Sequence, residues 1–375
     1  MTRLLPGDTA TESDRPHGTR RVLRYPDLAA TVYPYFVPPG LADELPDLYG
    51  TVFTTLDWFL TWDGRLPTGA CVLDDPRHVV LFYRDGATIE VLNKVFEMAP
   101  ADAARLCRAL FRALPLALRV HLDVMFPPYE LGLPRRRLLN HDYLMLDMPE
   151  SAEAYDASLS KSTRRKIRQG TKRLHRDFSE LSTDVVVPGQ DASPLVRQLA
   201  AWKIENFGRH GRTTYWETEN GRVERTAGLV ARCGEARVTS IAGRAVALAL
   251  VCRAGGGVLV LEVGFDPAYR YYDLGFLAFY WALRDAVASG ARSVNLHIGT
   301  PDFKERLGAR RVPVTTVSVF RSPLVRPLYA AEGARLLWDR RGVYLWGVRF
   351  LARWLARRVW RTPRSSTNDR TSPTD

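Results

Sequence analysis

Three side chains that can exchange protons lie in one stretch of this 375-residue chain: Glu262, His297 and Lys304. A carboxylate can accept a proton, an ammonium can donate one, and an imidazole titrates near neutral pH. Such groups suit a reaction in which one reactant loses a proton and a leaving group gains one. Simpler interpretations stay open: an exposed strand face for Glu262, a hydrogen-bonded structural histidine for His297, and a salt bridge with Glu262 or Asp302 for Lys304.

The elements that must position these residues follow a simple order. Apolar runs at 245–252 and 258–264 flank a turn of Ala and Gly, which predicts a β-hairpin. A loop over 265–273 follows, then an apolar helix that stops at Gly290, then a strand over 291–298. A strand that leads through a loop into a helix presents free N–H groups and the positive end of the helix dipole. This arrangement suits a pyrophosphate.

The loop carries a resemblance to a known family. The segment Arg270-Tyr271-Tyr272-Asp273-Leu274-Gly275 resembles the acyl-CoA pyrophosphate loop of GNAT acetyltransferases. The longer run GFDPAYRYYDLGFL, followed by GTPDFKERLGA, is similar to the FemAB and CelD-like branch, and the resemblance covers Ser151 to Pro323 well. Asp273 departs from the pattern, since a small residue is usual there; its carboxylate either caps the helix or repels a phosphate.

The resemblance implies an α/β fold of two tandem GNAT-like domains, with acyl-CoA (acetyl-CoA) as co-substrate. It assigns Glu262 as the base and Lys304, at the place of a usual Tyr, as proton donor or phosphate ligand; His297 would share this work. The cofactor-binding residues that it implies are Val263, Gly264, Arg270, Tyr271, Tyr272, Gly275 and Phe276. No P-loop, Ser-His-Asp pattern or metal-ligand spacing occurs, so no metal is expected.

Length and order indicate how the chain is divided. A chain of 375 residues exceeds one ordinary core. The order hairpin, helix, strand occurs at 78–125 and again at 245–298, which predicts an internal duplication. The first copy has MAPADAA where the second has its Arg and Gly loop. We therefore expect a disordered tail (1–24), a degenerate GNAT-like domain (25–150), a GNAT acyltransferase domain (151–325), a basic amphipathic helical segment (326–361) and a second tail (362–375).

The basic segment 161–178 predicts a helix with one apolar stripe and many cations. Arg164, Arg165 and Arg168 are candidates for binding substrate phosphates, and a solvated basic face is the alternative. In the resembling chains a similar helix opens the second domain. The next predicted helix, 195–211, carries Trp202 and Lys203 as candidate substrate residues, with core packing as the alternative for Trp202.

Composition limits the compartment and the partners. The net charge of +12 favours an acidic partner. We expect a cytoplasmic protein for three reasons. The four cysteines show no CxxC spacing, no apolar signal segment lies near the start, and no apolar run is long enough to span a membrane. Nine arginines against two acidic residues at 325–361, beside an aromatic face at 343–361, predict either binding to an anionic membrane surface or docking onto the protein itself.

These observations favour an N-acyltransferase that moves an acyl group from acyl-CoA or a similar thioester to a small-molecule or envelope-precursor amine. An aminoacyl-tRNA-dependent transferase of FemAB type is one alternative, in which the basic helix would hold RNA. A catalytically silent, membrane-associated partner of envelope or polysaccharide assembly is the other, which Asp273 favours and Arg270 and Gly275 oppose.

Overall fold

A computed structural model of the chain describes residues 21–125, 131–186, 191–298 and 301–329. The described residues up to Arg321 form one compact unit, and Ser322 begins a second. Of the second unit only the 3-10 helix η5 (Pro323–Tyr329) is described. The basic segment predicted at 326–361 therefore lies outside the described residues beyond Tyr329, and so does the tail predicted at 362–375.

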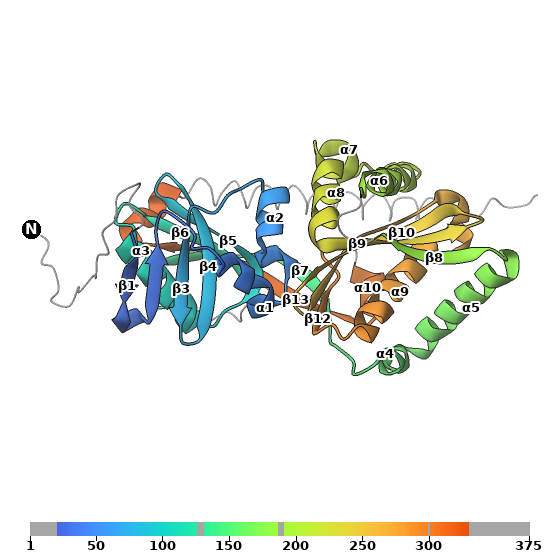
Figure 1. Cartoon of the computed structure of the whole chain (residues 1–375), viewed down its shortest axis with the longest axis horizontal. Helices are drawn as coiled ribbons and strands as arrows, with labels where there is room; N and C mark the ends of the chain where they lie inside the picture. Colours follow the sequence, from blue (N-terminus) through green and yellow to red (C-terminus); the bar gives the residue numbers. More distant parts are fainter. Residues whose placement is uncertain (1–20, 126–130, 187–190, 299–300, 330–375) are drawn as a thin grey trace, which may run out of the picture. The chain divides into compact units, whose positions relative to one another are not determined.

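Thirteen strands among the described residues form one sheet (Figure 1). In spatial order they are β1 (Leu23–Tyr25), β2 (Ala30–Tyr33), β3 (Gly69–Asp74), β4 (Arg77–Asp85), β5 (Thr88–Glu97), β6 (Arg119–Met125), β13 (Ala309–Phe320), β7 (Arg135–Leu146), β12 (Ser293–Asn295), β11 (Gly257–Phe265), β10 (Arg244–Ala254), β9 (Gly234–Ile241) and β8 (Leu181–Val186). Within this sheet the pairs β5–β6 and β11–β12 are parallel, and the other neighbours are antiparallel.

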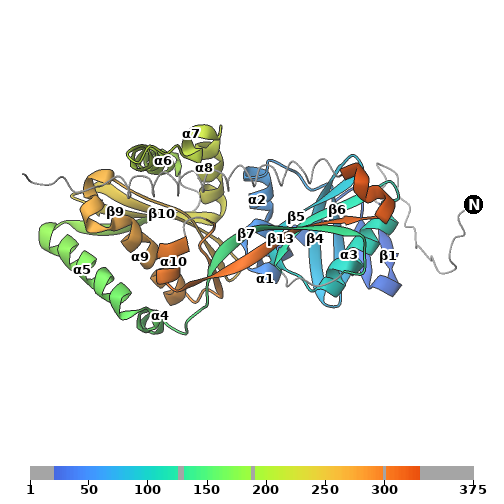
Figure 2. The same cartoon turned by 180° about the vertical axis from the view of Figure 1, so that it is seen from behind.

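Two long strands join the halves of the sheet. β13 pairs with β6 over Thr315–Phe320 and with β7 from Ala309 to Val319, and β7 also pairs with β12. Figure 2 shows β7 (green) and β13 (orange-red) running from one half to the other. The chain therefore builds one continuous sheet from two similar halves.

The predicted duplication is confirmed by strand order. In each half a three-stranded meander is followed by a helix and then by a strand that is parallel to the last strand of the meander. In the first half these elements are β3–β4–β5, α3 (Pro100–Ala113) and β6. In the second half they are β9–β10–β11, α9 (Leu274–Ala288) and β12. The halves differ in how far the parallel pair extends. β5 and β6 stay paired, across irregularities, to Glu97 and Met125, whereas β11 and β12 pair only over Gly257–Leu259 and Ser293–Asn295.

Helices cover both faces of the sheet. One core, which spans both halves, lies under η3 (Val52–Thr54), α1 (Leu45–Tyr49), α2 (Leu56–Thr61), α6 (Ser193–Gly208) and α8 (Arg222–Cys233). Opposite it, α3 covers the first half, and α4 (Ala152–Ser158), α5 (Lys161–Asp177), α9 and α10 (Pro301–Arg306) cover the second. Shorter elements are η1 (Pro26–Leu28), η2 (Leu41–Glu44), α7 (Tyr215–Thr218) and η4 (Pro267–Tyr272). Because β10 and β11 are buried on both faces, their sequences are apolar without alternation.

Two sequence expectations need correction. The strand expected over 291–298 ends at Asn295, because the Asn295 side chain accepts a hydrogen bond from the backbone N–H of His297 (2.7 Å), and His297 has a φ of 59°. The tail expected over 1–24 ends earlier, since β1 already begins at Leu23. The rest of that tail, residues 1–20, lies outside the described residues.

A glycine contact braces the site-bearing hairpin against the first half. A Cβ on Gly257 would lie 1.6 Å from the carbonyl oxygen of Gly50, so the two backbones meet directly. Ser293 donates a hydrogen bond to the same carbonyl (3.4 Å). The start of β11 and the start of β12 are thus held by the loop after α1.

Candidate active site

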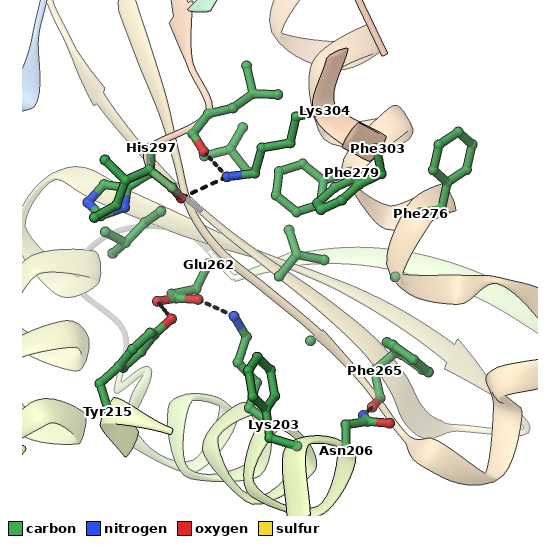
Figure 3. A pocket seen from close by; sticks show the side chains of 18 of the residues that line it. Lys203, Asn206, Tyr215, Glu262, Phe265, Phe276, Phe279, His297, Phe303 and Lys304 are labelled. Atoms are coloured by element: carbon green, nitrogen blue, oxygen red, sulfur yellow. Dashed lines mark hydrogen bonds and ion pairs between the residues drawn. The ribbon is translucent and has the colours of Figure 1, made fainter. Parts of the chain in front are cut away.

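A cavity of about 640 Å³ opens where β11 and β12 stop pairing (Figure 3). This volume is typical of small-molecule sites. Its walls come from α6, α7, α8, β11, α9, α10 and the segment after β12. The lining residues are Lys203, Asn206, Phe207, Tyr215, Glu219, Arg222, Val260, Leu261, Glu262, Val263, Gly264, Phe265, Gly275, Phe276, Phe279, Leu296, His297, Ile298, Phe303 and Lys304. The three proton-exchanging candidates from the sequence therefore share one cavity.

Glu262 lies at the polar end of the cavity with only 6% of its surface exposed. Its Oε2 accepts a hydrogen bond from Lys203, and its Oε1 accepts bonds from the Tyr215 hydroxyl (2.5 Å) and from Arg222 (3.3 Å). Burial by itself would raise the pKa of the Glu262 carboxyl, but Lys203 and Tyr215 outweigh burial and hold the pKa below its ordinary value. The carboxylate is therefore charged at neutral pH, and both of its oxygens accept hydrogen bonds.

Arg222 ties the polar end to the aromatic residues around it. Its guanidinium stacks on the rings of Tyr215 (4.2 Å) and Trp62 (4.4 Å) and pairs with Glu219 (3.0 Å) besides Glu262. Trp62 follows α2 in the first half, so that half supports the cavity of the second. Stacking and pairing together fix the orientation of a planar guanidinium.

Lys304 enters the cavity from α10, opposite Glu262 (Figure 3), and is 5% exposed. Its Nζ donates hydrogen bonds to the carbonyl oxygens of Leu296 (2.6 Å) and Ile298 (2.9 Å), and not to Glu262 or Asp302 as the ion-pair interpretation required. Burial lowers the pKa of Lys304 to about 8, although the charge of Glu262 acts in the other direction. A sizeable fraction of this amine is neutral near physiological pH.

His297 lies beside Glu262 and Lys304. Its ring stacks on Phe53 from η3 (5.9 Å between centroids) and meets the edge of Tyr143 from β7 (5.8 Å). Burial lowers the pKa of His297 to about 4, so the imidazole is neutral at pH 7. It offers the cavity a neutral ring nitrogen and not a positive charge.

The other end of the cavity is aromatic. Phe265, Phe276, Phe279 and Phe303 surround it, and Phe279 packs edge-on against Phe303 at 5.1 Å. Gly275 allows α9 to approach β11, because a Cβ there would lie 2.8 Å from the Phe265 ring. An apolar end beside a charged end can place an uncharged chain next to ionisable groups.

The start of α9 borders this aromatic end and keeps its first N–H groups uncapped. Asp273 has a left-handed backbone (φ 55°), and its side chain makes no capping bond. Instead it pairs with Lys166 (3.1 Å) and approaches Arg173 (4.0 Å), both on α5. The capping interpretation of Asp273 is therefore wrong, and its negative charge is offset by two cations.

Several residues that the sequence grouped with the site lie away from the cavity. Trp202 is buried in the core shared by α6 and α8 and does not line the cavity. Arg270 and Tyr271 are exposed on η4, and Tyr272 bonds to Asp177 (3.2 Å). The three arginine candidates of α5 are exposed, away from the cavity lining, and form no ion pair within the described part of the chain: Arg164, Arg165 and Arg168.

Three contributors were missed by sequence reasoning: Tyr215, Arg222 and Phe53. Tyr215 begins α7, which starts with a capping box at Thr214 and Glu217, a TxxE pattern that is visible in the sequence, and Arg222 begins α8 after a short loop. Nothing local in the sequence indicates that Phe53 reaches His297. Among the residues described here, no cluster of His, Cys, Asp or Glu could hold a metal, and no helix is long and apolar enough to cross a membrane.

Comparison with known families agrees with this geometry. Residues 161–305 match the family described as acetyltransferase (GNAT) domain. The match contains β11, the loop, α9, β12 and Lys304. The chain therefore carries a GNAT acetyltransferase domain, which is an enzyme domain for N-acyl transfer. No curated protein matches the chain significantly.

Three solved structures are similar to this chain at low sequence identity. FemX has 12% identity and a TM-score of 0.53, with 77% of this chain and 97% of FemX covered. L-PGS from Bacillus licheniformis has 12% identity and a TM-score of 0.48, with coverage of 76% and 92%. The C-terminal domain of a candidate lysylphosphatidylglycerol synthetase from Agrobacterium fabrum has 12% identity and a TM-score of 0.47, with coverage of 74% and 90%. The strand order of the two halves, together with the likeness to FemX and the GNAT match, makes the fold α/β with two tandem GNAT-like halves.

Proposed function

We propose that the protein transfers an acyl group from acyl-CoA, or a similar thioester, to an amine. The observation that carries the proposal is the cavity that opens as β11 and β12 separate, apolar and aromatic at one end and ionisable at the other. The thioester arm would lie along the aromatic end. Its carbonyl would then reach the polar end, where the acceptor amine would bind.

The residues at the start of α9 fit a phosphate-bearing donor. The helix begins without a side-chain cap, and Asp273 is neutralised by Lys166. Gly275 leaves room for close packing between α9 and β11. Arg270, Tyr271, Tyr272, Gly275 and Phe276 would hold the pyrophosphate, and Val263 and Gly264 would face the arm.

The acceptor amine is proposed to bind among Glu262, His297 and Lys304. Glu262 supplies a fixed negative charge that attracts an incoming ammonium and keeps Lys203 and Tyr215 in place. His297 supplies a neutral imidazole. Placing amine and thioester together in a partly closed cavity contributes to the rate by proximity alone.

Within the described residues of the first half, proposed as a degenerate GNAT-like domain over 25–150, the parallel strands do not separate as β11 and β12 do. Its parallel strands stay paired to Glu97 and Met125, which closes the gap that the second half keeps open. We propose that this half supports the active domain (151–325). Phe53 against His297 and Trp62 against Arg222 are its contributions.

Calorimetric titration with CoA and acetyl-CoA tests the donor. Wild type should bind both, and Arg270→Glu should weaken binding at least tenfold, or about 1.4 kcal/mol, because a carboxylate replaces a cation beside the pyrophosphate. Arg24→Glu makes the same charge change on exposed β1 and should leave affinity unchanged. Absence of CoA binding by wild type would refute the donor class.

The exposed cations of α5 favour a second candidate, an aminoacyl-tRNA donor as in the FemAB branch. Five of them form no ion pair within the described residues: Lys161, Arg164, Arg165, Arg168 and Lys172. A polyanion that contacts all five would show a steep dependence of affinity on salt, with a log–log slope of roughly −4. Replacing Arg164, Arg165 and Arg168 by Gln should make that slope shallower for tRNA and leave acetyl-CoA binding unchanged.

We further propose a cytoplasmic enzyme that visits an anionic membrane surface through residues 343–361, which lie outside the described residues. Truncation after Gly342 should reduce co-sedimentation with anionic vesicles. If wild type binds vesicles but neither donor, the silent assembly partner becomes the better explanation.

A further inference from the structure

We infer that Lys304 is the group that both removes the proton of the acceptor amine and returns a proton to the leaving thiolate. This inference rests on the proposed acyl transfer. The family resemblance instead implies that Glu262 is the base and that Lys304 donates the proton to the thiolate or binds phosphate. The geometry of the two side chains favours Lys304.

Three of the roughly four acceptor positions of the Glu262 carboxylate are already occupied. Both of its oxygens are occupied, by Lys203 on one side and by Tyr215 and Arg222 on the other. Only the second lone pair of Oε2, beside Lys203, remains for a proton from an amine, and protonating the carboxylate would weaken its interactions with Lys203 and Arg222. A carboxylate held in this way is a weak base.

Lys304 can change its protonation state without losing a contact. An ammonium has three N–H groups, and two of them point at the carbonyl oxygens of Leu296 and Ile298. A neutral amine keeps two N–H groups, so both bonds survive deprotonation and a lone pair takes the third position. That third position is the one left for the cavity, which Lys304 lines opposite Glu262 (Figure 3).

The surroundings of Lys304 make its neutral form accessible. Glu262 of β11 and Lys203 of α6 act on it with opposite charges, and His297 beside it is neutral. Tyr143 of β7, which contacts His297, has a pKa raised by burial and stays uncharged. With a pKa of about 8, about one tenth of Lys304 is neutral at pH 7, roughly 300 times more than for an ordinary lysine.

Lys304 alone then accounts for both proton transfers of the reaction. The acceptor nitrogen bonds to the thioester carbonyl carbon while its proton moves to the lone pair of Lys304. The carbon–sulfur bond breaks, and the Lys304 ammonium gives the proton to the sulfur. The products are an amide and a thiol, and Lys304 is again neutral. An acceptor that arrives as an ammonium first loses its extra proton to solvent.

The pH dependence of transfer tests the inference, with acetyl-CoA as donor and hydroxylamine as acceptor probe, because hydroxylamine stays unprotonated in alkaline solution. For wild type, kcat/KM should rise with pH to a plateau, with a midpoint near 8, as Lys304 becomes neutral. A base at Glu262 would instead give a flat profile over this range. A flat profile in an active wild type overturns the inference.

Two variants and one titration complete the test. Lys304→Arg keeps the positive charge but cannot deprotonate, and Lys304→Met removes both the charge and the ability to transfer a proton. In each variant kcat should fall 10²–10⁴-fold, while the Kd for acetyl-CoA should stay within a few fold of the wild-type value. Lys94→Arg, at a salt bridge in the first half, should behave as wild type. NMR of ¹³C-labelled lysine in the full chain should show one lysine, absent in Lys304→Arg, that titrates near pH 8.

The possible failures can be told apart. Titration of Lys304 above pH 10, or an active Lys304→Arg, overturns the role of Lys304 and leaves acyl transfer standing. A wild type that binds no acetyl-CoA and transfers no acetyl group overturns the proposed function, and the inference falls with it.

Discussion

Replacing Glu262 by Gln should destabilise the protein, because this carboxylate holds the polar end of the cavity together. Gln keeps the shape but offers one acceptor oxygen and one NH₂ group in place of two acceptor oxygens. Either Lys203, or the pair Tyr215 and Arg222, then faces an N–H group. The cations also lose their buried counter-charge.

The magnitude follows from burial. The side chains of Glu262, Arg222 and Lys203 are 6%, 10% and 19% exposed, so this is a largely buried ion pair, and breaking one costs about 3–5 kcal/mol. For a unit of about 300 residues this corresponds to a fall in Tm of roughly 5–8 °C. Glu219→Gln is the matched control. Glu219 pairs with the same Arg222 but is 45% exposed, so we expect at most about 1 kcal/mol.

Differential scanning calorimetry of the full chain measures both variants, and the Lys304 titration supplies a second readout. Because the charge of Glu262 raises the pKa of Lys304, Glu262→Gln should move that midpoint to lower pH. Adding Lys203→Met should recover part of the lost stability, since it removes an uncompensated cation. The reasoning fails if Glu262→Gln costs no more than Glu219→Gln, or if the Lys304 midpoint moves upward.

Three further predictions follow from single contacts. His297 has a pKa of about 4 in the folded protein and about 6.5 when unfolded. The free energy of unfolding should therefore fall by at most about 3 kcal/mol as the pH is lowered from 6.5 to about 4. In pH-dependent calorimetry, His297→Gln should show a smaller fall than wild type. Gly257→Ala should lower Tm, as its Cβ meets a backbone carbonyl, whereas Gly208→Ala in α6 meets nothing and should raise Tm slightly. Asp273→Asn should tighten CoA binding about two- to fivefold by calorimetry, because Lys166 would lose its carboxylate partner and become available to the pyrophosphate, and weaker binding would contradict this reasoning.

Local pattern was enough to predict the part of the site that lies close together in the chain. Glu262, His297 and Lys304 follow one another through β11, the segment after β12 and α10, and a strand–helix–strand unit with a parallel pair brings these strand ends to one edge of the sheet. The hairpin, the helix α9 and the duplication were predictable for the same reason. Each is encoded by periodicity or by a turn within a few tens of residues.

Tertiary structure decided what those side chains can do. The sequence contains Lys203, Tyr215 and Arg222, but only folding places all three on Glu262 and makes it a held charge. Likewise Asp273 fits a helix cap in sequence, yet α5 packs beside it and supplies Lys166 as its partner.

The end of the β11–β12 pairing is equally hard to see in the sequence, because mostly apolar residues follow both Leu259 and Asn295, although β12 itself ends at Asn295. Protonation states depend on which groups are excluded from water together. Elements distant in the chain set that environment: α6, α7 and α8 around Glu262, and Phe53 and Tyr143 around His297. The sequence alone therefore determined which groups could react, and long-range packing determined which of them is charged, which is neutral and which is free to accept a proton.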